Sequence, residues 1–235
     1  MFSEPIQLKI SLAMRDWFKK MGAIIFDFDG TLALLNIDFL LMKRKVFGLM
    51  DEFGVDGSLL HETYLLEIID EVYRLLMERD SSKAESFFEK AHQILHQVEM
   101  EAARGGTLLP GVKELLNFLR ERGLKIGIIT RNCEEAVRRV FPEVDEYCDV
   151  FISRDSVRKV KPHPDHLNAV TKRLGISGEE AVMVGDHPLD IQAGKRVGMR
   201  TIGVLSGRTT KEEFEKAGAD EILKDVTEVR VLLDG

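Results

Sequence analysis

Acidic, hydroxyl and basic side chains recur beside short apolar runs in this 235-residue sequence. The set comprises Asp27 and Asp29 in DFDGT, Thr130 at the end of LKIGIIT, Lys161 in KPHP, and Asp186 and Asp190 in GDHPLD. Several carboxylates near a hydroxyl and a lysine could bind a cation and handle an anionic group. The first question is therefore which ion and which anion such a set would suit.

Carboxylates gathered in this number would repel one another unless a cation lay among them. Their oxygen atoms are hard ligands, and no paired histidine or cysteine set accompanies them, so the pattern favours Mg²⁺ over zinc. The cation and Lys161 together would offset the acids and let the pocket accept a phosphate. Thr130 and backbone N–H groups at the start of the next helix could bind the remaining phosphate oxygens.

Short apolar runs of strand character supply the elements that would hold these groups. They cover residues 23–28, 124–130, 148–153, 181–185 and 200–205, with a weaker strand at 219–223. Helical patterns at 111–122 and 164–175 lie between them, and a short helix is expected at 225–233. This alternation predicts an α/β fold with a doubly wound parallel sheet. Ligands bind such sheets beyond the carboxyl ends of the strands, where the polar residues lie.

The interval from 34 to 107 breaks the alternation, because it reads as consecutive helices without a strand. In the last of these helices the apolar residues follow the i, i+3, i+4, i+7 spacing of one face. Ser82 with Glu85 predicts a capping-box start, and Gly105-Gly106 a stop. We therefore expect a Rossmann-like core formed by 1–33 and 108–235, and an inserted helical domain over 34–107.

Composition limits the classes of partner. The net charge of −7, with both signs mixed along the chain, argues against nucleic-acid binding. No apolar run is long enough for a membrane-spanning helix, and no secretory signal opens the sequence. Cys133 and Cys148 have no CxxC spacing, so we expect free thiols and a cytoplasmic location. Oligomeric state is not predicted.

Taken in order, the motifs resemble those of the haloacid dehalogenase superfamily. DFDGTL is similar to its first motif, Thr130 to its second, Lys161 in KPHP to its third and GDHPLD to its fourth. The helical insert falls where the family's type 1 helical cap would lie. The resemblance, nearest to phosphoglycolate phosphatases, implies a magnesium-dependent phosphatase acting on small organophosphate monoesters, with a small phosphorylated metabolite as substrate.

The resemblance also implies roles for the acids. Asp27 would be the nucleophile that forms an aspartyl-phosphate, and Asp29 would protonate the leaving alkoxide and then deprotonate water. Asp27, the backbone carbonyl of Asp29, and Asp186 would be metal ligands. Asp190, expected on the same helix face as Asp186, would orient the metal shell from outside it.

Phosphate binding is implied for Thr130, Arg131 and Lys161, and Lys161 would also keep Asp27 ionised. Arg131 stands where the family often has a small or amide residue, and could bind a second anionic group or pair with a nearby acid. His187 replaces a small polar residue. A solvent-facing or hydrogen-bonded histidine is favoured there over a contact with the leaving group.

Other functions share part of this pattern. A phosphoryl-transfer mutase of the β-phosphoglucomutase kind would carry all four motifs, so it stays an alternative. A receiver-like protein that accepts phosphate without catalysis would also place acids, a threonine and a lysine on a doubly wound sheet. Receivers have no helical insert and about half this length, which disfavours them. A dehalogenase would lack Asp29, because a leaving halide needs no proton.

Overall fold

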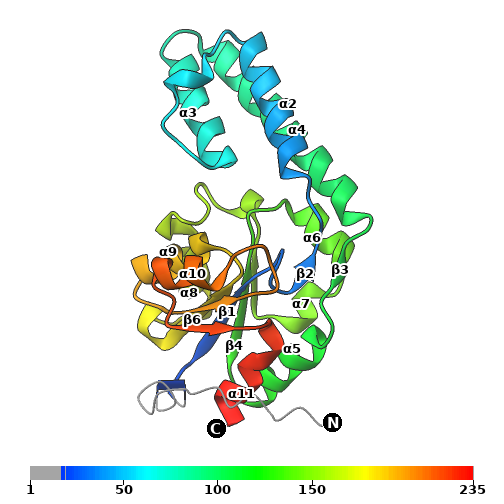
Figure 1. Ribbon diagram of the computed structural model, residues 1–235, viewed down its shortest axis with the longest axis vertical. Helices are drawn as coiled ribbons and strands as arrows, with labels where there is room; N and C mark the ends of the chain where they lie inside the picture. The colour runs from blue at the N-terminus through cyan, green and yellow to red at the C-terminus, as the bar shows by residue number, and fades with distance from the viewer. Residues whose placement is uncertain (1–16, 19, 235) are drawn as a thin grey trace. The chain divides into compact units, whose positions relative to one another are not determined.

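The computed structural model describes residues 17, 18 and 20–234 (Figure 1). The chain separates into two compact units. The first is formed by the chain up to Leu34 and from Gly106 onward, and the second by Leu35–Gly105. Within the described residues, every helix is too short or too polar to cross a membrane.

Six parallel strands form the sheet of the first unit, in the order β5-β4-β1-β6-β7-β8. Their bounds are β1 Ala23–Asp27, β4 Lys125–Ile129, β5 Val150–Ile152, β6 Ala181–Gly185, β7 Arg200–Val204 and β8 Glu221–Leu223. Every residue of β1 and β6 is buried, as expected for strands covered on both faces. The predicted α/β fold with a parallel sheet is confirmed.

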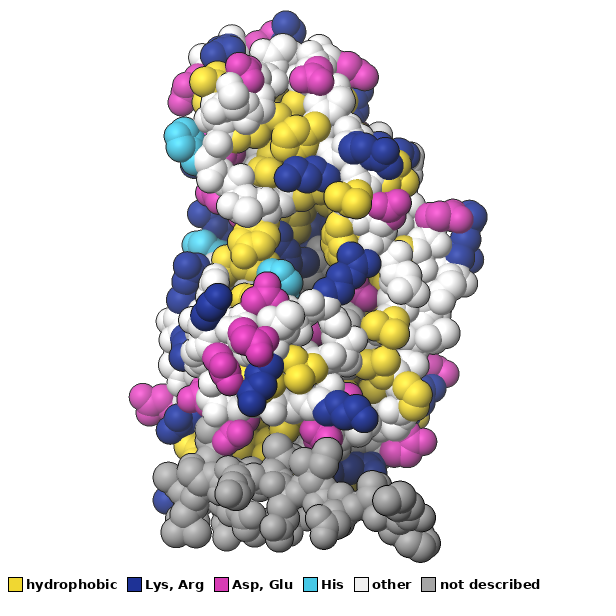
Figure 2. All heavy atoms as spheres, in the orientation of Figure 1, with side chains coloured by type: hydrophobic (Ala, Val, Ile, Leu, Met, Phe, Trp, Pro, Cys, Tyr) yellow, Lys and Arg dark blue, Asp and Glu magenta, His cyan; other side chains and the backbone are white. Residues whose placement is uncertain are grey.

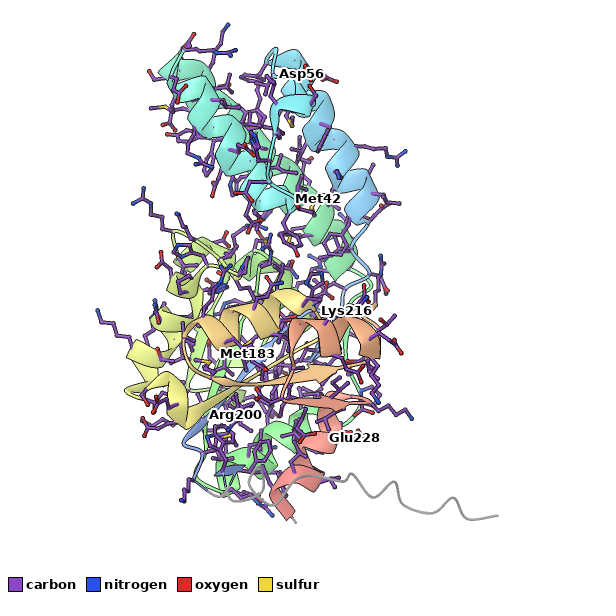
Figure 3. All side chains as sticks on the ribbon, turned by 60° about the vertical axis from the view of Figure 1, so that its left-hand side comes forward. Met42, Asp56, Met183, Arg200, Lys216 and Glu228 are labelled. Carbon is purple, nitrogen blue, oxygen red and sulfur yellow. The ribbon has the colours of Figure 1, made fainter. Side chains whose placement is uncertain are left out.

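Helices cover both faces of this sheet (Figure 1). The bounds are α5 Val112–Glu121, α6 Glu134–Val140, α7 Val144–Tyr147, α8 Pro164–Leu174, α9 Pro188–Arg196, α10 Lys211–Ala217 and α11 Val229–Asp234. Helices α8, α9 and α10 lie side by side on one face, and α5 and α7 pack together on the other. Between α8 and the sheet, an apolar cluster joins Leu167 and Val170 of the helix to Ile25 and Met183 of the strands. Met183 is labelled in Figure 3. The short helices α6 and α7 were not predicted.

The strand register brings the polar strand ends to one edge. Asp27, the last residue of β1, lies opposite Ile129 of β4, and Phe26 lies opposite Val184 of β6. The loops after these three strands therefore start at the same level of the sheet. This edge is where a parallel sheet of this kind binds its ligands.

A short antiparallel ribbon lies where the helical segment leaves and rejoins the first unit. It consists of β2 (Ala33–Leu34) and β3 (Thr107–Leu108), which pair residue for residue. The N–H of Leu109 also donates to the carbonyl of Leu32 at 2.9 Å. The two ends of the insertion are therefore held together within the first unit.

The second unit consists of helices α2 (Phe39–Glu52), α3 (Leu65–Met77) and α4 (Ser81–Ala103). Helix α4 packs against both of the others. The buried faces carry apolar side chains at helical spacing, among them Ile69, Val72, Phe87, Ala91 and Leu95. The predicted inserted helical segment is confirmed. On the face seen in Figure 2, Lys and Arg side chains are interspersed with Asp and Glu rather than gathered by sign.

The start of α4 differs from its prediction. Asp80 caps this helix, because its Oδ1 accepts the backbone N–H of Lys83 at 3.1 Å. Glu85, expected to complete a capping box with Ser82, accepts the hydroxyl of Tyr73 at 2.6 Å. The predicted capping box is therefore wrong. Aspartate caps a helix as well as serine does, and Asp80 precedes Ser82 in the sequence, so α4 begins at Ser81.

Candidate active site

Lys161 joins two acids, one at the end of a strand and the other in a helix. Its Nζ donates to Oδ1 of Asp27 at the end of β1, and to Oδ1 of Asp190 in α9 at 2.5 Å. All three side chains are buried, with at most 8% of any of them exposed. The ammonium therefore compensates two carboxylates that water cannot reach.

The acid cluster holds more negative charge than this lysine offsets. Burial raises the pKa of Asp27 to about 7 against the opposing effect of Lys161, and Asp190 adds to the rise. Burial also raises the pKa of Asp186 to about 9, with Asp27 and Asp190 adding to it. Burial acts to lower the pKa of Lys161, but Asp190 and Asp27 outweigh it and hold that pKa above its ordinary value. Lys161 by itself therefore does not keep Asp27 fully ionised at neutral pH.

Asp27, Asp186 and Asp190 could together hold a metal ion. Each offers a carboxylate oxygen, and the three oxygens lie within 4.8 Å of one another. The ligands are hard oxygens, and the raised pKa values show that a further positive charge would be accommodated, so the residues fit a divalent cation. The carboxylate of Asp29 is not part of this group among the described residues. The ligand predicted from Asp29 is its backbone carbonyl.

Asp190 is fixed by the start of α9. Its Oδ2 accepts the N–H of His187 at 3.0 Å, and His187 Nδ1 accepts the N–H of Leu189 at 3.2 Å, so the two form a capping box. Asp186 lies before this helix, which begins at Pro188. The expectation that Asp186 and Asp190 share one helix face is therefore wrong. His187 has a capping role, and burial lowers the pKa of its ring.

Thr130 and Arg131 follow β4 at the same edge. Thr130 is buried, and its Oγ1 accepts the N–H of Asn132 at 3.1 Å, which leaves the hydroxyl proton available to a ligand. Arg131 is half-buried, and its guanidinium donates to the backbone carbonyl of Lys161. The loop after β4 and the loop that carries Lys161 are thereby joined. Asn132 adds a buried Nδ2 that has no hydrogen-bond partner among the described residues.

A profile described as haloacid dehalogenase-like hydrolase matches residues 24–204 of this chain. This range contains every motif residue described above. The chain belongs to this family.

Relatives and solved structures agree with this assignment. A pyrophosphatase, PpaX, from Bacillus cereus is 30% identical over 201 residues, which cover 83% of this chain and 90% of the relative. A structure assigned as a beta-phosphoglucomutase from Thermotoga maritima is 25% identical, with a TM-score of 0.56 over 91% of this chain and 97% of the other. One assigned as a phosphoglycolate phosphatase from Lactobacillus delbrueckii is 22% identical, with a TM-score of 0.61 over 91% and 98%. The protein is thus an enzyme of the hydrolase class.

In this haloacid dehalogenase-like hydrolase, the backbone of Lys161 is held by a histidine that the sequence did not single out. His166 Nδ1 accepts the N–H of Lys161, and its Nε2 donates to the carbonyl of Ile152, both at 3.2 Å. Burial, with Lys161 adding to it, lowers the pKa of His166 to about 3, so the ring is neutral. Its place in α8, five residues after Lys161, was a usable signal, but many buried histidines have no such partner.

The loop after β7 was likewise not identified from the sequence as part of the site. Ser206 Oγ donates to the carbonyl of Gly30 at 2.7 Å, which ties this loop to the DFDGT segment. Arg154, buried after β5, donates to the carbonyl of Arg131 at 3.0 Å. Neither residue lies in a motif, and a serine or an arginine in a loop gives no signal without its partner. The site thus includes a scaffold of loop-to-loop contacts around the motif residues.

Proposed function

We propose that this hydrolase is a magnesium-dependent phosphatase that acts on small organophosphate monoesters through an aspartyl-phosphate. One observation carries the proposal. The buried carboxylate of Asp27, at the end of β1, accepts a hydrogen bond from Lys161, and one of its oxygens lies within 4.8 Å of a carboxylate oxygen of Asp186 and of Asp190. A nucleophilic carboxylate needs this combination of a cationic partner and a cation site in order to meet an anionic phosphate.

The chemistry divides into two displacements. In the first, an oxygen of Asp27 bonds to phosphorus while the bond from phosphorus to the leaving oxygen breaks, and Asp29 donates a proton to that oxygen. In the second, Asp29 takes a proton from water, the water oxygen bonds to phosphorus, and the bond to Asp27 breaks. Inorganic phosphate leaves, and both acids return to their starting states.

The roles proposed for the other polar residues follow from the charges that the site must balance. Lys161 and the hydroxyl of Thr130 would hold the phosphoryl oxygens, and Asp190 accepts a hydrogen bond from the lysine at 2.5 Å, which supports this role. When bound, Mg²⁺ would supply the positive charge that keeps Asp27 and Asp186 ionised beside an anionic substrate. Asp27, Asp186 and the carbonyl of Asp29 would hold it.

The substrate proposed is a small phosphorylated metabolite. The inserted helices, residues 34–107, would act as a cap that limits the size of the leaving group, and residues 1–33 and 108–235 would form the catalytic core. Arg131, held beside Lys161, would bind a second anionic group on the substrate. Pyrophosphate should also be assayed, because the Bacillus cereus relative is a pyrophosphatase. Like the proposed substrate, pyrophosphate carries two anionic groups.

A phosphoryl-transfer mutase is the second candidate, favoured by the likeness to the Thermotoga maritima structure. The two functions differ in the fate of the phosphoryl group. A phosphatase transfers it to water, whereas a mutase returns it to the sugar. Release of inorganic phosphate from a panel of phosphorylated metabolites, set against isomerisation of β-glucose 1-phosphate, separates them.

The proposed nucleophile is tested with Asp27→Asn, which keeps the shape of the side chain. We expect hydrolysis of p-nitrophenyl phosphate with Mg²⁺ to fall by at least about 1,000-fold, because an amide cannot form the phosphorylated intermediate. Asp51→Asn, at an exposed position in α2, is the control and should keep wild-type turnover. Turnover near the wild-type rate in folded Asp27→Asn would remove Asp27 from the nucleophile role.

A further inference from the structure

We propose that Ser206 and Gly207, in the loop after β7, are positioning residues that hold the Asp186 carboxylate in place for a divalent cation. The inference rests on the cation site of the proposed function and is independent of the substrate. It concerns how the chain fixes a ligand that is less buried than its neighbours Asp27 and Asp190.

The Asp186 carboxylate lies between two glycines from different loops. A Cβ added to Gly30 would come within 2.2 Å of Asp186 Oδ2, and one added to Gly207 within 2.0 Å of the same oxygen. Both separations are far below van der Waals contact, so any side chain at either position would displace the carboxylate. The backbone of each glycine therefore forms one wall of a slot around Asp186.

Ser206 closes this slot. Its hydroxyl donates to the carbonyl of Gly30 at 2.7 Å, which fastens the loop after β7 to the loop after β1. The preceding residue, Leu205, donates its N–H to Leu223 of β8 at 3.0 Å, so the loop is anchored to the sheet as well. A carboxylate held between two fastened walls keeps its orientation before the ion arrives, which raises affinity for the ion.

Substitution of Gly207 by alanine tests the proposal without backbone strain, because the backbone of Gly207 is not in the left-handed region. The described glycines with positive φ include Gly30 at 85° but not Gly207. Alanine at 207 is therefore compatible with the backbone, and the three atoms nearest its methyl group all belong to Asp186. Gly22→Ala is the matched control, since a Cβ there meets its nearest atom at 3.8 Å.

The experiment is a calorimetric titration of the purified full-length chain with Mg²⁺ alone. We expect the dissociation constant for Mg²⁺ to rise by about 10-fold to 100-fold in Gly207→Ala, as for other residues that orient metal ligands. Gly22→Ala should bind Mg²⁺ as the wild type does. An unchanged constant in folded Gly207→Ala would overturn the proposal.

A second pair covers the case in which Gly207→Ala does not fold. Ser206→Ala should weaken Mg²⁺ binding, and Ser206→Thr, which keeps the hydroxyl, should restore it. A loss of melting temperature without Mg²⁺, together with unchanged Mg²⁺ affinity in Ser206→Ala, would show a merely structural role and contradict the proposal. If the wild type binds Mg²⁺ but hydrolyses no phosphate ester, the proposed function fails while this inference stands.

Discussion

At the scale of single residues, Lys161 offsets part of the negative charge of the site. It is buried with Asp27 and Asp190 and hydrogen-bonded to both. A buried charge that loses its partner costs more than the pair contributes, because the remaining ion stays out of water. The residue should therefore matter for stability as well as for turnover.

Replacing Lys161 by methionine tests both effects. We expect turnover of p-nitrophenyl phosphate to fall by at least about 100-fold. The free energy of unfolding at neutral pH should fall by about 3–5 kcal/mol, because buried carboxylates lose their cation. The destabilisation should shrink near pH 5, where Asp27, with its raised pKa, takes up a proton.

Urea unfolding at both pH values and steady-state kinetics measure these outcomes. Lys159→Met is the control, because Lys159 is exposed in the same loop and should change neither quantity. A Lys161→Met protein as stable as the wild type would mean that its acid partners are not buried as described.

At the scale of elements, helix α2 contains a glycine that the fold does not need. Gly48 lies in the middle of this helix, it is exposed, and a Cβ there would meet nothing within 4 Å. Gly54, just past the end of the same helix, has equally free space but a φ of +69°. Neither position is limited by packing, and the two differ in backbone conformation, so comparing them isolates the effect of conformation on stability.

Gly48→Ala is expected to stabilise the helical unit by about 0.5–1 kcal/mol, because alanine loses less backbone entropy in a helix. Gly54→Ala should destabilise it, since alanine is strained at positive φ. Amide hydrogen exchange of α2 measures both changes. Equal effects from the two substitutions would show that helix propensity does not limit the stability of this unit.

For the whole molecule, pH and Mg²⁺ should act on stability together. The folded chain raises the pKa of Asp27 to about 7 and of Asp186 to about 9, from an ordinary value of 3.8. Without a cation, the unfolded chain therefore ionises first as the pH rises. Their contribution to stability is complete below about pH 4 and is lost as the pH rises through these two values.

Magnesium should reverse this loss, because it binds the ionised carboxylates of the folded chain only. We expect the increase in melting temperature caused by millimolar Mg²⁺ to be small near pH 5 and to grow toward pH 9. Thermal unfolding with Mg²⁺ or EDTA across this range measures it. Asp186→Asn should flatten the dependence, and a Mg²⁺ effect that is equal at all pH values would argue against ion binding at these acids.

Much of the fold and of the site follows from local signals in the sequence. Continuous apolar runs ending in Asp27, Thr130 and Gly185 predicted buried parallel strands and the edge at which their polar groups meet. A strand buried on both faces leaves this pattern in any context. The helical insert was equally visible, because its apolar stripes have a different period. The cap of α4 was not, since Asp80 and Ser82 are nearly equivalent as helix caps.

Tertiary structure alone decided which groups hold the site together. Ser206 lies 176 residues from Gly30, and Lys161 lies 134 from Asp27 and 29 from Asp190, so no local pattern links these pairs. The slot around Asp186 depends on the close approach of its carboxylate to the backbones of Gly30 and Gly207, which a sequence does not display. The chemical groups, and the sheet edge to which they belong, were predictable from local patterns, because strand and helix periods are local. Their burial, their pKa values and the walls around Asp186 come from contacts between distant segments, which exist only in the folded chain.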